Sequence, residues 1–230
     1  LFYFRIPIRV GVFSQWHSFL FLNAGLRQKR SRAIQHESSY NYELVDLLAQ
    51  KLKAGSYGHV PIRNTHLPEV PILQLSAKTD KPLLEKWNLR AHSYFIIHPG
   101  MAGSSLNWPQ SKYIQFIYSF HSSFPNQKIV LTGTAGDTPY LDKIISEFSS
   151  KDFFVNLQSQ LTPNELLSVL STSSGVLAPS TGVMHLAASL GVPTFGIFSP
   201  VTVQRPVRWG PRGRFTKVYQ ATGSENDPDC

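Results

Sequence analysis

Hydroxyl and glycine residues gather in three segments, and each segment directly follows a short apolar run. These segments are His98–Pro109 (HPGMAGSSLNWP), Leu131–Asp137 (LTGTAGD) and Ser180–His185 (STGVMH). Hydroxyl groups, and backbone N–H groups left open by small residues, donate hydrogen bonds to the oxygens of a phosphate group. The first segment offers Ser104 and Ser105 for this purpose. The residue types therefore predict phosphate-binding chemistry.

The third segment lies inside Gly175–Pro200, which has the pattern of a strand, a helix and a second strand. Gly175–Ala178 and Thr194–Phe198 are short apolar runs typical of buried parallel strands. Gly191 and Pro193 end the intervening helix. One face of that helix is apolar, with spacings of i, i+3, i+4 and i+7: Val183, Leu186, Ala187 and Leu190.

The start of this helix is the most specific candidate site. Ser180 or Thr181 can cap it, and Gly182 leaves backbone N–H groups open at the positive end of the helix dipole. His185 lies one turn further on. A histidine in an amphipathic helix can also be a packed or surface residue, so its pattern favours neither interpretation.

Strands and helices alternate from Ser93 onward, which predicts a parallel sheet covered on both faces. The carboxyl ends of such strands share one edge, so the three polar segments are expected to meet there. The expected strands are Tyr94–Ile97, Lys128–Thr132 and Phe153–Val155, and the expected helices are Ser111–Ser122, Thr138–Phe148 and Thr162–Leu170. Thr162 and Glu165 form a predicted capping box.

The first 82 residues have a different organisation. A strand is expected at Ile6–Phe13 and a helix at His36–Leu52, followed by a proline-rich connection at Gly55–Pro82. We therefore divide the chain into domains at 1–82 and 83–230.

The net charge of +8 favours anionic partners: nucleic acid, an acidic membrane surface or a phosphorylated substrate. A basic surface without a specific role is the alternative, and the cluster Arg27–Arg32 has the same two interpretations.

No apolar run approaches the ~18 residues of a membrane span. Cys230 is the only cysteine, so an internal disulfide is excluded and a reducing cytoplasm is favoured.

Several kinds of site lack their motifs. No GxGxxG, no P-loop and no G-x-S-x-G elbow occurs, and the histidines have no metal-binding spacing. Carboxylates are scarce in the three segments. Asp137 is the main one, and it is more simply interpreted as the N-cap of the next helix than as a site residue.

The chain resembles the glycosyltransferase family 9 heptosyltransferases. The resemblance rests on HPG and NWP within His98–Pro109, on the glycine-rich turn Thr132–Gly136 and above all on Ser180–Pro200. It implies a GT-B-like α/β fold: a Rossmann-like C-terminal domain with a parallel sheet, preceded by the end of an incomplete N-terminal Rossmann-like domain. It also implies inverting, metal-independent transfer of a sugar from a nucleotide-sugar, ADP-linked in this family, without a cofactor.

The resemblance assigns donor-binding roles residue by residue. Ser104 and Ser105 lie in the loop that contacts the diphosphate, and the helix start contacts the same group. The implied donor-binding residues are Ser104, Ser105, Gly133 near the ribose, Leu161 near the adenine, and Ser180, Thr181, Gly182 and His185. The catalytic base is not among them, because the family's Asp is expected upstream of Leu1.

Three positions differ from the family pattern. Leu106 replaces a lysine, Ser180 replaces an aspartate and Ala135 stands where a glutamate can bind the ribose. The cation lost at Leu106 could be replaced by one of three residues: Arg205, Arg208 or Lys112. The sequence does not predict the donor sugar, the acceptor or the linkage.

The expected function is therefore sugar transfer to a lipopolysaccharide-type or other envelope glycan. The partners implied are a nucleotide-sugar donor and an anionic glycolipid acceptor, with no nucleic acid, in the cytoplasm or peripherally at the inner membrane. Two alternatives stay open. One is a non-catalytic nucleotide- or glycan-binding fragment that lacks the base, and the other is a sugar-nucleotide epimerase of the same fold.

Overall fold

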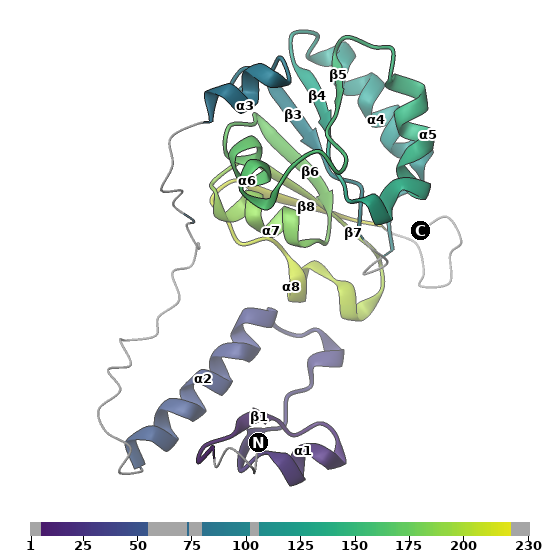
Figure 1. Ribbon diagram of the computed structural model, residues 1–230. Helices are drawn as coiled ribbons and strands as arrows, with labels where there is room; N and C mark the ends of the chain where they lie inside the picture. Colours follow the sequence, from purple (N-terminus) through teal and green to yellow (C-terminus); the bar gives the residue numbers. More distant parts are fainter. Residues whose placement is uncertain (1–5, 55–72, 74–79, 102–105, 222–230) are drawn as a thin grey trace. The chain divides into compact units, whose positions relative to one another are not determined.

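The computed structural model describes residues 6–54, 73, 80–101 and 106–221 (Figure 1). The chain divides into two compact units. The small unit comprises Leu1–Leu67 with Val207–Trp209, and the sheet unit comprises Pro68–Pro206 with Gly210–Cys230. The expected boundary between residues 82 and 83 stays a prediction, because most of the chain from 55 to 79 lies outside the described residues.

The sheet unit is built on six parallel strands in the order β5-β4-β3-β6-β7-β8. The strands are β3 (Tyr94–Ile97), β4 (Lys128–Leu131), β5 (Phe154–Asn156), β6 (Gly175–Pro179), β7 (Thr194–Phe198) and β8 (Thr216–Gln220). The chain winds from β3 outward to β5 and then returns to the other side of β3 through β6. The strand order therefore reverses between β3 and β6.

Helices cover both faces of this sheet, as the alternating pattern predicted. Right-handed crossovers place α4 and α5 on one face and α6 and α7 on the other, and Figure 1 shows these two layers. The helical elements of the sheet unit are α3 (Lys81–Lys86), α4 (Gln110–Ser123), η2 (Ala135–Asp137), α5 (Thr138–Phe148), α6 (Pro163–Ser171), α7 (Gly182–Ser189) and η3 (Thr202–Gln204). The short helix α8 (Pro206–Trp209) falls mostly in the small unit.

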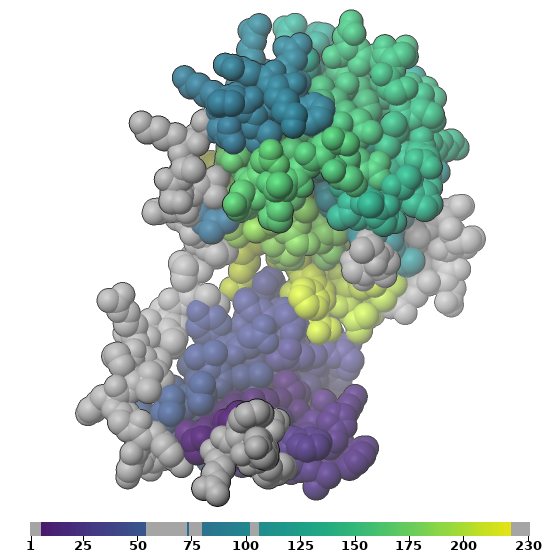
Figure 2. All heavy atoms as spheres, in the orientation of Figure 1, coloured from purple at the N-terminus to yellow at the C-terminus, as the bar shows by residue number. Residues whose placement is uncertain are grey.

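The core explains why these segments fold as they do. All four residues of β3 are buried, and the apolar stripe of α5 (Leu141, Ile144 and Phe148) is fully buried against the sheet. Burial of side chains of this size contributes about 1.5–3 kcal/mol each. The space-filling view shows the side chains of the sheet unit closely packed on the face that it presents (Figure 2). The capping box of Thr162 and Glu165 is present, as predicted.

The small unit contains two parallel strands, β1 (Val10–Val12) and β2 (Ala24–Leu26), with α1 (Trp16–Phe21), η1 (Arg30–Arg32) and α2 (Glu37–Ala54). Tyr40 of α2 is buried, and its hydroxyl donates to the carbonyl of Lys29. The strand predicted at Ile6–Phe13 is shorter than expected, and the sequence did not predict α1. Among the described residues, no helix is long and apolar enough to cross a membrane.

Candidate functional site

The reversal of strand order between β3 and β6 defines where a ligand is expected. In doubly wound sheets, ligands bind outside the carboxyl ends of the strands at this kind of switch point. The segment after β3 begins at His98, and the segment after β6 begins at Ser180. Two of the three polar segments predicted from sequence therefore flank the switch point, and the third follows β4 beside them.

His98 is the first residue after β3, and its side chain is buried at the carboxyl edge of the sheet. Its backbone N–H donates to the carbonyl of Leu177 in β6, and its Nδ1 lies 2.9 Å from Oγ1 of Thr132. Burial lowers the pKa of His98 to about 4, an effect that the charge of Asp137 partly opposes. The imidazole is therefore neutral at pH 7. This side chain is not among the residues that the sequence predicted for the site.

Asp137 lies outside α5 as expected, but its side chain does not cap that helix. The carboxylate turns back and accepts hydrogen bonds from the backbone N–H (2.8 Å) and hydroxyl (2.7 Å) of Thr134. It also accepts from the backbone N–H of Met101 at 3.2 Å. Asp137 is therefore the N-cap residue of α5 by position, as predicted, but its carboxylate makes no capping bond to that helix, because the short η2 turn between β4 and α5 redirects it toward the loop after β3.

The start of α7 is the place where the sequence predicted hydrogen-bond donors for a phosphate group. Thr181 is the N-cap residue, yet its side chain does not cap the helix, and its buried Oγ1 has no hydrogen-bond partner among the described residues. Nothing lies within 4 Å of the place where a Cβ on Gly182 would stand. The first N–H groups of a helix have no partner within the helix, so this end can receive an anion.

The other residues predicted to bind the donor are spread over several elements of the sheet unit. Ser180 follows β6 directly, and His185 lies half-buried in the second turn of α7. Gly133 is needed for packing, because a Cβ there would stand 2.6 Å from Cδ1 of Leu141. Leu161 is half-buried in the loop after β5, just before the Thr162 cap. Ser104 and Ser105 lie outside the described residues.

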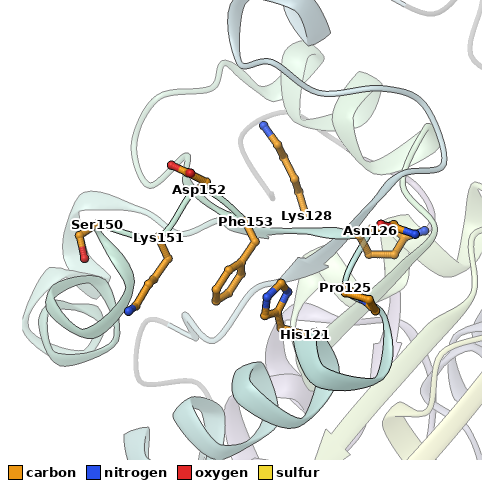
Figure 3. Close-up of a pocket in the computed structure, with 9 residues that line it drawn as sticks. His121, Pro125, Asn126, Lys128, Ser150, Lys151, Asp152 and Phe153 are labelled. Atoms are coloured by element: carbon orange, nitrogen blue, oxygen red, sulfur yellow. The ribbon is translucent and has the colours of Figure 1, made fainter.

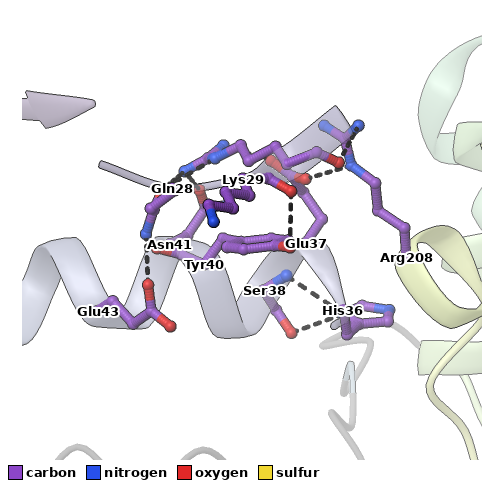
Figure 4. A network of polar contacts seen from close by, with 10 residues as sticks. Gln28, Lys29, His36, Glu37, Ser38, Tyr40, Asn41, Glu43 and Arg208 are labelled. Carbon is purple, nitrogen blue, oxygen red and sulfur yellow. Dashed lines mark hydrogen bonds and ion pairs between the residues drawn. The ribbon is translucent and has the colours of Figure 1, made fainter. Parts of the chain in front are cut away.

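The candidate cations differ in their surroundings. Arg208 belongs to the small unit, where its Nε donates to Glu37 at 2.8 Å and its guanidinium also donates to the carbonyl of Arg30 (Figure 4). Arg205 and Lys112 are exposed, the former just before α8 and the latter in the first turn of α4. Arg208 is therefore already engaged by a carboxylate.

A cavity of about 550 Å³ lies at the opposite end of the sheet, near the starts of β4 and β5 (Figure 3). His121 and Phe153 stack in its wall with ring centroids 3.7 Å apart. It is lined by His121, Pro125, Asn126, Gln127, Lys128, Ser150, Lys151, Asp152 and Phe153. None of these residues belongs to the predicted site.

Within the described ranges, no group of three or more His, Cys, Asp or Glu side chains could hold a metal ion.

The class of protein follows from this arrangement. A doubly wound sheet with polar loops at its carboxyl edge matches the GT-B-like fold of solved glycosyltransferases. Escherichia coli ADP-heptose lipopolysaccharide heptosyltransferase II superposes with a TM-score of 0.69 over 95% of this chain and 63% of that one, at 19% identity. A Veillonella parvula family 9 glycosyltransferase gives 0.66 over 94% and 56%, at 16% identity. Escherichia coli WaaC with ADP gives 0.58 over 94% and 60%, at 18% identity.

The chain belongs to glycosyltransferase family 9 (heptosyltransferase), whose family model matches residues 44–228. A Haemophilus influenzae protein with a provisional glycosyltransferase name is 24% identical over 216 residues, covering 90% of this chain and 58% of that protein. Lipooligosaccharide heptosyltransferase 2 of the same organism is 24% identical over 104 residues, covering 44% and 30%. The predicted family and fold class are confirmed, and the chain spans little more than half of the first of these relatives.

Proposed function

We propose that this chain is the donor-binding part of a glycosyltransferase that moves a heptose or related sugar from an ADP-linked donor to an envelope glycan. The observation that carries the proposal is the open start of α7 at the switch point of the sheet, between β3 and β6. The name of the solved WaaC complex supports ADP as the nucleotide, because that relative binds it.

The proposed diphosphate position lies against Thr181 and Gly182. The Thr181 hydroxyl has no partner in the described structure, and a phosphate oxygen would supply an acceptor for it. The open space at Gly182 would let the same phosphate approach the first N–H groups of α7. These donors would stabilise the negative charge that develops on the leaving nucleoside diphosphate.

The proposed reaction is inverting and independent of a metal. An acceptor hydroxyl attacks the anomeric carbon, the bond from that carbon to the diphosphate breaks, and a general base takes the hydroxyl proton. The hydrogen-bond donors at α7 would take the place of a metal in stabilising the leaving group. None of the residues proposed to bind the donor is assigned the role of this base.

The proposed acceptor is an anionic glycolipid, reached by peripheral contact with the cytoplasmic face of the inner membrane. The net charge of +8 supports this proposal. So does α1, which exposes Trp16, Phe19 and Leu20, with the guanidinium of Arg27 5.8 Å from the centre of the Phe19 ring. Exposed aromatic groups beside cations suit the interface of an anionic bilayer.

Two experiments test the proposal. Isothermal calorimetry of the 230-residue chain should show binding of ADP in preference to UDP, and absence of ADP binding would contradict the proposal. A transfer assay with the complete gene product, an ADP-linked heptose and a lipopolysaccharide-type acceptor then tests catalysis. Binding without transfer would favour the non-catalytic alternative.

A further inference from the structure

Asp137 connects the loop after β3 with the loop after β4. Its Oδ1 accepts from the N–H of Met101, and its Oδ2 accepts from the N–H and hydroxyl of Thr134. The carboxylate is buried, with 6% of its surface exposed. A buried carboxylate held by several donors has a fixed orientation, since losing any one bond would leave charge unsatisfied.

Gly100 shows how closely the two loops approach. A Cβ at Gly100 would stand 2.3 Å from Oδ2 and 2.5 Å from Cγ of Asp137. Among the described glycines only Gly191 has a positive φ, so the backbone of Gly100 is one that alanine can also adopt. The glycine is therefore required at this position by the Asp137 carboxylate and not by backbone conformation.

The strand order determines toward which neighbouring strand the contact with Asp137 holds the loop after β3. β3 lies between β4 and β6, and Asp137 follows β4. Asp137 therefore holds Gly100 and Met101 toward the β4 side of the sheet. The switch point lies on the other side of β3, toward β6 and the start of α7. A loop held toward β4 leaves that side accessible to a ligand.

We propose that Asp137 is a positioning residue that holds Gly100 and Met101 away from the switch point and so keeps the diphosphate position open. This inference rests on the proposed function, because it presupposes that a nucleoside diphosphate binds at the start of α7. Asp137 does not touch the ligand, and its effect passes through the backbone that it holds.

The first test compares ADP with adenosine, which lacks the diphosphate. Asp137→Asn keeps the size of the side chain but removes the charge and one acceptor oxygen. We expect ADP affinity to fall about tenfold or more while adenosine affinity changes less than about twofold. Asp142→Asn, the same change at an exposed position of α5, should alter neither. An equal loss for both ligands, or no loss for ADP, would overturn the inference.

A double-mutant cycle provides a second test that does not depend on one variant. Gly100→Ala should weaken ADP binding in the unsubstituted chain, because its Cβ displaces the carboxylate. In an Asp137→Ala background the same Cβ meets no carboxylate, so Gly100→Ala should cause no further loss. Additive losses would show that Gly100 acts independently of Asp137, contrary to the inference.

Amide hydrogen exchange of Met101 separates this inference from the proposed function, since it needs no ligand. Asp137→Asn should speed exchange at Met101, because the amide loses a charged acceptor. Unchanged exchange together with unchanged ADP affinity would overturn the inference. If the unsubstituted chain bound no ADP, the proposed function would fail, and faster Met101 exchange would still establish that Asp137 holds the loop.

Discussion

His98 and Thr132 join the carboxyl ends of two neighbouring strands through a side-chain hydrogen bond of 2.9 Å between Nδ1 and Oγ1. His98 follows β3 and Thr132 follows β4, and both side chains are buried. The bond lies at the edge where the donor is proposed to bind. A neutral imidazole can form this hydrogen bond without placing a charge at the buried edge. Protonation of His98 would place a charge there, so the protonation state of His98 affects the stability of the fold.

The stability of the protein should depend on pH through His98. Its pKa is about 4 when folded against an ordinary value of 6.5, so the unfolded state binds more protons between these values. His98 therefore contributes its full stability above pH 6.5, and the contribution falls as pH drops toward 4. Between pH 7 and pH 5 the loss should be about 2 kcal/mol, measured by urea unfolding.

The matched variants identify the source of this pH dependence. His98→Gln should be less stable at pH 7 and should lose less stability on going to pH 5. His17→Gln changes an exposed histidine of α1 and should keep the dependence of the unsubstituted protein. An unchanged pH dependence in His98→Gln would show that another group is responsible.

Replacing Thr181 by valine should have opposite effects on stability and binding. The Oγ1 atom of Thr181 is buried without a partner in the described structure, so its removal should leave the unfolding free energy unchanged or raise it by up to about 1 kcal/mol. ADP affinity should fall about fivefold or more, and further when His185→Ala is added. Thermal unfolding and calorimetry on the same samples measure both.

Thr172→Val is the control for that pair of effects. The Thr172 hydroxyl lies 2.6 Å from the hydroxyl of Tyr94 and donates to the carbonyl of Ser168. Its removal should destabilise the fold by about 1–3 kcal/mol without changing ADP affinity. If Thr181→Val bound ADP as well as the unsubstituted chain does, the proposed diphosphate position would be wrong.

Substitution of Gly182 and of Gly133 by alanine should have different effects, because the first glycine leaves space for the ligand and the second leaves space for a packed side chain. At Gly182 a Cβ meets nothing within 4 Å, so Gly182→Ala should fold normally and weaken ADP binding by occupying space left for the ligand. At Gly133 a Cβ would meet Leu141, so Gly133→Ala should lower stability by about 1–3 kcal/mol. Melting curves and calorimetry should therefore rank the two variants in opposite orders.

The ion pair of Glu37 with Arg208 should stabilise the small unit without affecting the donor. Glu37 also pairs with Arg30, and the side chains of Glu37 and Arg208 are only 13% and 15% exposed. Arg208→Ala should cost about 1–3 kcal/mol, because it leaves part of a largely buried carboxylate unpaired. ADP affinity should not change, and a marked loss would indicate that Arg208 contributes to donor binding.

The sequence alone determined the class of fold and the start of α7. Apolar runs of strand length alternating with amphipathic helices leave few arrangements other than a covered parallel sheet. Local chemistry likewise set the capping box at Thr162 and Glu165, whose partners are three residues apart. These features were predictable because neighbours in the sequence produce them.

Only the tertiary structure decided what His98 and Asp137 do. His98 meets Thr132 across 34 positions of sequence, and Asp137 meets Met101 across 36. Local pattern predicted Asp137 at the N-cap of α5, where it lies, but only the η2 turn and the β3–β4 pairing brought the backbone N–H of Met101 within reach of its carboxylate. Strand pairing and burial set these distances and the low pKa of His98, and neither can be obtained from the residue types of one segment.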